Sequence, residues 1–399
     1  MRRFCLGLMV VWLLLTVARP LSAQSVSVIR GEATATYRFG QVMEFRLALD
    51  SRQPITAATL FITTHELAQT LAIDLEFDPA QELELTYQLD LTQLRLAPFS
   101  RVTYWWVAVD ERGYEWRANE QELEYADDQF AWRQLSRQDV AIYWTGDDLS
   151  LGETALDIVS ESLPRIRAII PVEDGFPIRV YIYPSLADLR TALRLSGRDW
   201  IGAHAQPDLG VILVVAANPR TAGVDLRQSI PHELSHLLLY QATGMAYTAV
   251  PRWFDEGLAT LFEADPNPIY GQLVNAAVSG GTIIPVADLC RQFPETEAQV
   301  ALAYAQSLDL VRFIEVEYGR QALQDMILAF ADGADCQTAV RRTLDLSVTE
   351  LEQQWLRSHQ TESNLYRFFQ QNGLLLLLLL GGFGLTVLLL RPTNPETAA

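Results

Sequence analysis

Cysteine and histidine are both scarce in this chain of 399 residues, which has three cysteines and five histidines. Only Cys290 and Cys336 lie beyond the first 23 residues, so the body of the protein can form at most one disulfide bond. From the sequence, either these two cysteines pair or both remain as buried thiols. The scarcity also disfavours a structural zinc site, because such sites close with four cysteine or histidine ligands.

Basic residues are few relative to acidic ones. The chain has 30 lysines and arginines against 49 aspartates and glutamates, and its formal net charge is −19. So acidic a protein does not attract nucleic acid or an anionic membrane surface over long distances. We therefore expect no nucleic-acid partner.

The two ends of the chain have the composition of targeting and membrane segments. Residues 1–23 begin with basic residues, continue with an apolar run and end in small residues, in the order of a secretory signal peptide. An uncleaved anchor helix is the alternative. Residues 373–390 contain one polar side chain, Thr386, and are long enough for a short transmembrane helix. A buried core helix is less well supported, because only the polar residues 391–399 follow to cover it.

These segments predict a single-pass membrane protein whose body lies outside the cell membrane and whose tail, residues 391–399, is cytoplasmic. Residues 361–372 would link the body to the membrane helix. Cleavage of the signal peptide would remove three arginines and no acidic residue, which changes the net charge from −19 to −22.

Between the ends, the sequence predicts an α+β protein with two domains. Residues 24–126 contain about seven strand-like segments separated by turn residues, with a hairpin turn at Arg112-Gly113. This pattern predicts a β-sandwich of the immunoglobulin or fibronectin type III style, without the cysteine pair of antibody domains. In residues 127–360, strand-like and helix-like segments alternate up to residue 217, and helices follow. Ser185 is expected to cap one of these helices.

The stretch "SIPHELSHLLLY", residues 229–240, contains two of the five histidines. On a helix, His232 and His236 are spaced i and i+4, so both imidazoles can reach one tetrahedral metal ion. Glu233 lies beside His232 and can take a proton from a water molecule without binding the metal, as in the H-E-x-x-H zinc hydrolases. The alternative is that both histidines are ordinary buried side chains.

The residues around the motif are typical of a helix. Ser229 is a suitable N-cap with Pro231 in the first turn, and Gly244 is a suitable terminator. If Asp225–Gln228 are helical as well, Pro231 lies inside the helix and bends it just before the histidines.

A catalytic zinc ion needs three protein ligands and one open position. Twenty residues after His236, the helix-like segment "PRWFDEGLATLFEAD" contains Glu256 one turn from its start. Two antiparallel helices joined by a short loop would bring Glu256 beside the histidines. Asp255 and Glu263 are competing candidates. The sequence thus predicts one Zn²⁺ per chain.

The segment "HELSH", followed twenty residues later by "WFDEGLA", resembles the gluzincin metallopeptidases, specifically the bacterial peptidase MA-like proteins. The resemblance covers residues 127–358. It implies His232, His236 and Glu256 as zinc ligands and Glu233 as the catalytic base. It also implies a thermolysin-like fold: a small sheet with an edge strand over the cleft, two motif helices and a helical lobe.

Membrane-alanyl-type aminopeptidases share the zinc motif, but the segment "GAHAQ" here lacks the acidic residue of their amine-binding G-x-M-E-N motif. The departure favours an endopeptidase. Tyr304, and as second candidate His204, is expected to donate a hydrogen bond to the oxyanion. The strand at residues 210–217 is expected to be the edge strand that pairs with an extended substrate.

These patterns lead to two functional hypotheses. The first is a membrane-anchored, extracytoplasmic zinc metallopeptidase that cleaves peptide or protein substrates. The alternative is a catalytically inactive relative in which the β-sandwich binds a partner at the cell surface.

Overall fold

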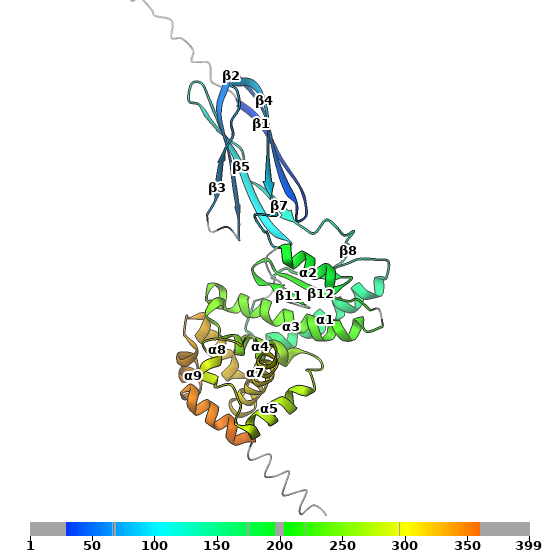
Figure 1. Cartoon of the computed structure of the whole chain (residues 1–399), viewed down its shortest axis with the longest axis vertical. Coiled ribbons are helices and arrows are strands. Elements are labelled where there is room, and N and C mark those ends of the chain that lie inside the picture. Colours follow the sequence, from blue (N-terminus) through cyan, green and yellow to red (C-terminus); the bar gives the residue numbers. More distant parts are fainter. Residues whose placement is uncertain are drawn as a thin grey trace, which may run out of the picture. The chain divides into compact units, whose positions relative to one another are not determined.

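The computed structural model describes residues 29–359, apart from residues 66, 68, 174, 196–202, 219 and 295. These residues form two compact units (Figure 1), one comprising the described residues up to Asp90 with Arg101–Glu124, the other Leu91–Ser100 with those from Tyr125 onward. Among the described helices, none is long and apolar enough to cross a membrane. The segments predicted as signal peptide, linker, transmembrane helix and tail lie outside the described residues: 1–23, 361–372, 373–390 and 391–399.

The first unit is a seven-stranded sheet. Its strands are β1 (Ile29–Arg38), β2 (Val42–Thr64), β3 (Leu71–Asp74), β4 (Ala80–Asp90), β5 (Ser100–Asp110), β6 (Glu115–Arg117) and β7 (Gln121–Tyr125). The first half of β2 pairs with β1 and β4, and its second half pairs with β3 and β5. The long strand β2 therefore belongs to both halves of the unit.

Residues 42–50 and 57–64, which count as two of the strand-like segments in the sequence, are thus one strand, β2. Its pairing register shifts between Asp50 and Ala57, which lets the sheet fold over on itself. Phe45 in the first half packs edge-on against Tyr104 of β5, with ring centroids 5.0 Å apart. The N-terminal region is β-rich as expected, but its layers belong to one continuous sheet, whereas an immunoglobulin-type sandwich has two separate sheets.

The predicted hairpin turn at Arg112-Gly113 is present between β5 and β6. The carboxylate of Asp110 accepts hydrogen bonds from the backbone N–H groups of Arg112 and Tyr114, both at 2.9 Å. Gly113 has a φ of 76°, a left-handed conformation that glycine adopts at low cost. Local turn chemistry therefore sets this connection.

The second unit begins with a five-stranded sheet. Its strands are β8 (Arg133–Arg137), β9 (Val140–Trp144), β10 (Ile178–Tyr183), β11 (His204–Gln206) and β12 (Val211–Val215). The order is β11-β12-β10-β9-β8, in which the three inner strands are parallel and both outer strands are antiparallel to their neighbours. The prediction that residues 210–217 form the edge strand was wrong, because β12 is internal and β11 is the edge. The edge strand was missed because three residues are too few to show an alternating pattern.

The two faces of this sheet are covered differently. On one face, Ile142, Val180 and Ile182 share a core with apolar side chains of α1 (Leu149–Arg167) and α3 (Ala222–Thr243). On the other face, the rings of Tyr143 and Tyr181 stack with centroids 4.3 Å apart. The helix α3, which carries the histidine motif, is therefore fixed directly on the sheet.

The rest of the second unit is helical. Its elements are α2 (Leu186–Leu195), η2 (Gly244–Ala249), α4 (Arg252–Phe262), α5 (Ile269–Gly280), α6 (Val286–Leu289), α7 (Glu297–Tyr318), α8 (Arg320–Ala331) and α9 (Cys336–Leu344). Residues 348–359 are helical as well. Ser185 caps α2 as predicted, since its hydroxyl accepts a hydrogen bond from the N–H of Asp188 at 3.1 Å.

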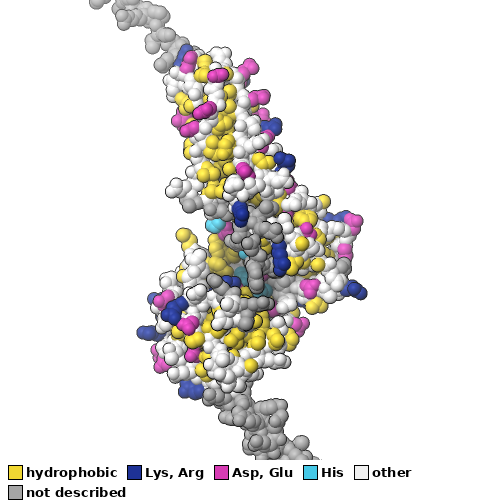
Figure 2. Space-filling model, in the orientation of Figure 1, with side chains coloured by type: hydrophobic (Ala, Val, Ile, Leu, Met, Phe, Trp, Pro, Cys, Tyr) yellow, Lys and Arg dark blue, Asp and Glu magenta, His cyan; other side chains and the backbone are white. Residues whose placement is uncertain are grey.

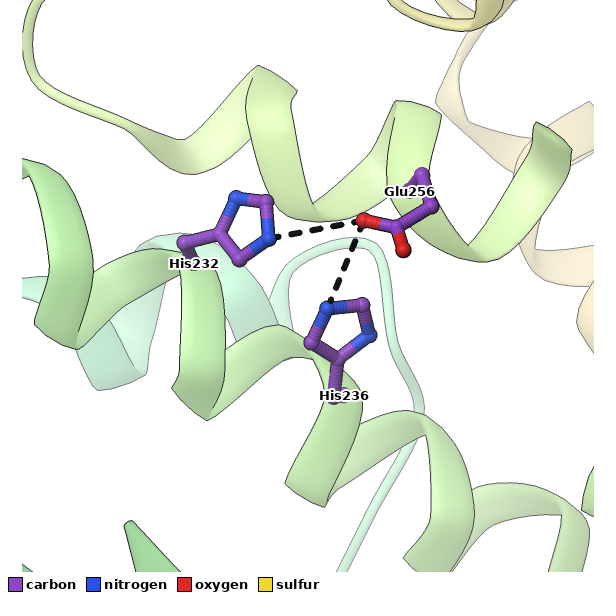
Figure 3. Close-up of side chains that lie close together, drawn as sticks. All are labelled: His232, His236 and Glu256. Carbon is purple, nitrogen blue, oxygen red and sulfur yellow. Dashed lines mark ion pairs between the residues drawn. The ribbon is translucent and has the colours of Figure 1, made fainter. Parts of the chain in front are cut away.

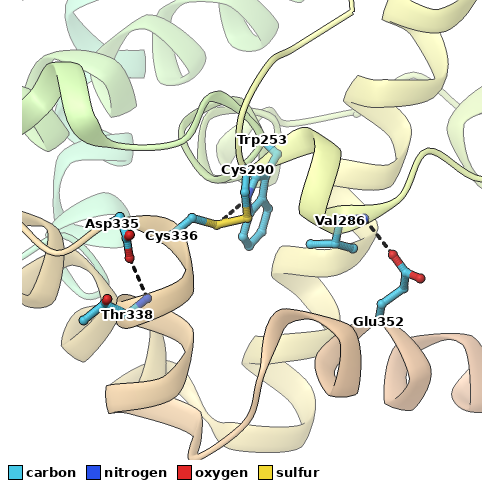
Figure 4. The surroundings of a disulfide bond; sticks show 7 residues. All are labelled: Trp253, Val286, Cys290, Asp335, Cys336, Thr338 and Glu352. Carbon is cyan, nitrogen blue, oxygen red and sulfur yellow. Dashed lines mark hydrogen bonds between the residues drawn. A yellow bond between two sulfur atoms is a disulfide. The ribbon is translucent and has the colours of Figure 1, made fainter.

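Cys290 and Cys336 form a disulfide bond, with their Cα atoms 5.7 Å apart (Figure 4). The bond joins the end of α6 to the start of α9. The indole N–H of Trp253 in α4 points to the sulfur of Cys336 at 3.5 Å. The disulfide therefore lies against the helix that carries Glu256.

Charged side chains of both signs are interspersed on the face drawn in Figure 2. Arg137 pairs with Asp157 at 3.4 Å, and Arg227 of α3 pairs with Glu161 of α1 at 3.0 Å. Exposed pairs of this kind contribute at most about 1 kcal/mol each. The fold therefore depends chiefly on its buried apolar side chains.

Candidate metal centre

The helix α3 presents both histidines of the motif on one side. It begins at Ala222, so Ser229 is not the N-cap, and Pro231 lies inside the helix. Gly244 ends the helix as predicted. Leu234, Leu237 and Leu238 are buried in the core, which fixes the rotation of the helix about its axis.

The third candidate ligand comes from α4 (Figure 3). Oε2 of Glu256 lies 3.5 Å from Nε2 of His232 and 3.7 Å from Nε2 of His236. The ligand atoms of the three residues lie within 4.8 Å of one another. All three side chains are largely buried, with exposed fractions of 17%, 13% and 8%.

The other nitrogen of each histidine is bound by a carboxylate. Nδ1–H of His232 donates to Oε1 of Glu263 at 2.8 Å, and Nδ1–H of His236 donates to Oδ1 of Asp255 at 2.6 Å. These bonds leave both Nε2 atoms free to bind a metal, in the arrangement that orients histidine ligands in zinc proteins. Asp255 and Glu263, the competing candidates for third ligand, are therefore partners of the histidines, and Glu256 is the acid that could serve as the third ligand.

The donor set fits a zinc ion. Two imidazole nitrogens and one carboxylate oxygen are the ligands of a common class of catalytic zinc sites, which keep a fourth position open. Oε2 of Glu256 is buried and has no hydrogen-bond partner among the described residues, although unpaired buried carboxylate oxygens are costly. A cation between the three side chains would satisfy this oxygen.

The carboxylates around the histidines change their proton affinity. Burial alone lowers the pKa of both imidazoles, because it disfavours the charged form. For His232, Glu256 and Glu263 outweigh burial and raise the pKa well above its usual value. For His236, Asp255 and Glu256 raise the pKa to about 9. Both imidazoles therefore hold a proton more tightly than an exposed histidine does.

The two glutamates of the motifs are affected in opposite directions. Burial raises the pKa of Glu233, whose carboxylate accepts a hydrogen bond from the backbone N–H of Ala205. Burial also raises the pKa of Glu256, but the two histidines and Arg252 outweigh it and lower the pKa to about 2. Glu256 is thus held as an anion, while Glu233 takes up a proton more readily than an exposed glutamate.

Both candidate oxyanion donors lie in described elements. Tyr304 of α7 hydrogen-bonds with Glu256 and Arg252, and burial raises the pKa of its phenol, so it remains a donor. His204 lies on the edge strand β11, next to Ala205, which contacts Glu233. The structure therefore joins Tyr304 to the ligand group through these hydrogen bonds, whereas His204 lies next to the residue that contacts Glu233.

Two residues of the site were missed in the sequence. Arg252 donates from Nε to Oε1 of Glu256 at 3.2 Å, and the hydroxyl of Tyr247 donates to Oδ2 of Asp255 at 2.8 Å. The i, i+4 spacing of Arg252 and Glu256 was a usable signal. Tyr247 lies in the short 3₁₀ helix η2, which is too short for the sequence to show a periodic signal.

The chain matches a protein-family model over a range that includes the candidate site. Residues 159–361, about half of the chain, match the family model of the Peptidase MA superfamily. No curated protein sequence matches the chain.

Two solved structures are similar at 14% sequence identity, each with a TM-score of 0.39. The M1 zinc metallopeptidase from Deinococcus radiodurans is matched over 84% of this chain and 94% of its own. A two-domain M1 zinc metallopeptidase mutant bound to L-arginine is matched over 82% of this chain and 92% of its own. The family assignment rests on the family model and not on these distant similarities.

Proposed function

Because the chain belongs to the Peptidase MA superfamily, we propose that it is a zinc-dependent endopeptidase, held in a membrane by residues 373–390 with its body outside the cell membrane. The observation that carries the catalytic part is the convergence of the ligand atoms of His232, His236 and Glu256. The sequence of residues 1–23 and 373–390 supports the location.

Zinc, when bound at this site, supplies a Lewis acid that polarises the scissile carbonyl and lowers the pKa of water. Glu233 is the general base. Its buried carboxylate, oriented by the N–H of Ala205, accepts the proton of the attacking water and delivers it to the leaving amine. The raised pKa of Glu233 suits both steps, because a base must also release the proton it takes.

Tyr304 is the proposed donor to the oxyanion. Its phenol stays protonated in this environment, and its hydrogen bonds with Arg252 and Glu256 hold it beside the ligand group. An oriented donor of this kind stabilises the negative charge that develops on the carbonyl oxygen.

Cleavage within a chain is supported by the edge strand β11. In the described sheet, β11 pairs with β12 on one side. An extended peptide can add to the other side of such a strand through backbone hydrogen bonds. None of the three residues of β11, His204–Gln206, is acidic, so the strand supplies no carboxylate for a free amino terminus.

The test is the zinc content and peptidase activity of the purified full-length protein in detergent. We expect zinc to be lost in a His232→Ala, His236→Ala variant and kept in a His65→Ala variant, which removes an exposed histidine of the β-rich unit. Elemental mass spectrometry measures the metal. A parent protein that binds no zinc, even when zinc is supplied, would refute the proposal.

The catalytic step is tested separately with Glu233→Ala. This variant should keep its zinc and lose turnover of a peptide library, since Glu233 is not a ligand. Mass spectrometry of the products distinguishes internal from terminal cleavage. If Glu233→Ala cleaves peptides as fast as the parent, the assigned base is wrong.

A further inference from the structure

Pro231 is an unusual residue for its position. It lies in the interior of α3, immediately before His232. Proline is the least favourable residue inside a helix, because it lacks the N–H that would bond to the carbonyl four residues earlier and its ring crowds that carbonyl. Because this proline destabilises the helix that contains it, we expect it to have a compensating role.

The carbonyl that Pro231 leaves unbonded is that of Arg227. It accepts a hydrogen bond from the backbone N–H of Ala264 at 3.3 Å. Ala264 follows Glu263, the residue at which α4 ends and the chain turns to an extended conformation. The turn of α3 that contains Arg227 is therefore hydrogen-bonded to the residue that follows the C-terminal end of α4.

The next residue of the same turn adds a second contact. Nε2 of Gln228 donates to Oε2 of Glu263 at 3.3 Å. The remaining oxygen of Glu263, Oε1, accepts the Nδ1–H of His232 at 2.8 Å. A continuous set of contacts thus links the backbone carbonyl of Arg227 to Nδ1 of His232.

We propose that Pro231 is a positioning residue of the metal centre: by freeing the carbonyl of Arg227 for Ala264, it holds Glu263 on Nδ1 of His232. The proposal rests on the zinc site of the proposed function. It predicts that the least helix-compatible residue of α3 improves zinc binding while it weakens its own helix. A residue with a purely structural role would change both properties in the same direction.

The test is Pro231→Ala in the full-length protein. Alanine restores the N–H at position 231, which can then bond to the carbonyl of Arg227 and displace Ala264. We expect the dissociation constant for zinc to rise about tenfold, at the low end of the effect of removing a partner of a ligand histidine. Over the same change, the unfolding midpoint of the metal-free protein should stay equal or rise.

A matched control is Pro164→Ala in α1. Pro164 is also a proline inside a helix, and it lies outside this contact set. It should affect the unfolding midpoint in the same direction as Pro231→Ala and leave the zinc dissociation constant unchanged. Chelator competition measures the affinity, and thermal unfolding measures the midpoint.

Two further measurements locate the effect. In a Glu263→Gln background, Pro231→Ala should cause little additional loss of affinity, because the residue through which it acts is already changed. The amide of Ala264 should be protected from hydrogen exchange in the metal-free parent and exchange faster in Pro231→Ala.

The outcomes separate the two proposals. A parent that binds no zinc refutes the proposed function. If the parent binds zinc and Pro231→Ala binds it equally well, or loses the same affinity in the Glu263→Gln background, the role of Pro231 is refuted alone. An amide of Ala264 that exchanges at the same rate in both proteins also refutes it.

Discussion

Replacing Gly257 with alanine tests whether close packing of α4 on α7 sets the position of Glu256. A Cβ atom at Gly257 would lie 2.5 Å from the backbone oxygen of Ser307 and 2.7 Å from Cγ2 of Val311. Ordinary contacts of a Cβ atom begin at 3.4 Å, so the two helices must separate by roughly 0.9 Å, the difference between 3.4 and 2.5 Å. The obstructing atom belongs to the backbone and cannot rotate away.

The expected magnitude follows from two opposing terms. Overpacking of a core costs about 1–3 kcal/mol, and the rigid neighbour puts Gly257→Ala near the upper end. Alanine gains about 1 kcal/mol over glycine in helix propensity. We therefore expect the free energy of unfolding to fall by about 2 kcal/mol, and the zinc affinity to fall because Glu256 moves with α4.

The assay is denaturant unfolding of the metal-free protein together with chelator competition for zinc. Gly271→Ala is the matched control, because Gly271 lies in α5 and a Cβ atom there meets no atom of the described residues within 4 Å. The control should be neutral or stabilise the protein by up to about 1 kcal/mol. Equal stability of Gly257→Ala and the parent, or equal destabilisation by both substitutions, would refute the packing argument.

Three other predictions follow from the contacts of the site. Tyr304→Phe should lower kcat by about 10²–10³-fold, as expected for an oxyanion donor, with zinc content unchanged; an unchanged kcat in steady-state peptide hydrolysis excludes the role. Tyr247→Phe should weaken zinc binding several-fold by freeing Asp255, whereas Tyr240→Phe, a neighbouring ring 5.5 Å away, should not; equal affinities in chelator competition would contradict this. The zinc affinity should rise with pH up to about 9, because the raised pKa of His236 means that a proton must leave before its nitrogen binds metal. Titration calorimetry in two buffers should detect the released protons. A zinc affinity that does not change with pH would contradict the assignment of His236 as a ligand.

The family and the ligand group were predictable because their signals are local. The i, i+4 spacing of His232 and His236 places both side chains on one face of any helix that contains them. The family prediction was confirmed by the family model, and the structure brings Glu256 to both histidines. The turn at Arg112-Gly113 and the cap at Ser185 were predicted for the same reason, since each depends on a few neighbouring residues.

Features set by distant pairing were missed. Residues 42–50 and 57–64 form one strand because of their partners: β1 and β4 flank the first half of β2, and β3 and β5 flank the second half. The sequence of β2 alone does not specify these partners. The edge strand was misassigned because β12 has a clear apolar pattern, whereas β11 is three residues long. The start of α3 was placed too late because Ser229 and Pro231 imitate a helix N-terminus.

The positions of Asp255 and Glu256 in α4, and of Glu263 at its C-terminal end, follow from the direction of the helices. Because α3 and α4 run antiparallel, the earlier histidine, His232, meets the later acid, Glu263, and the later histidine, His236, meets the earlier acid, Asp255. Glu256 lies between these two contacts, where it faces Nε2 of both histidines. The sequence contains three candidates of the same chemistry, and only the relative register of the two helices decides which of them faces both histidines. The bond between Ala264 and the carbonyl of Arg227 joins the two helices at this register, so under our proposal Pro231, the residue before the motif, helps to decide which acid faces both histidines.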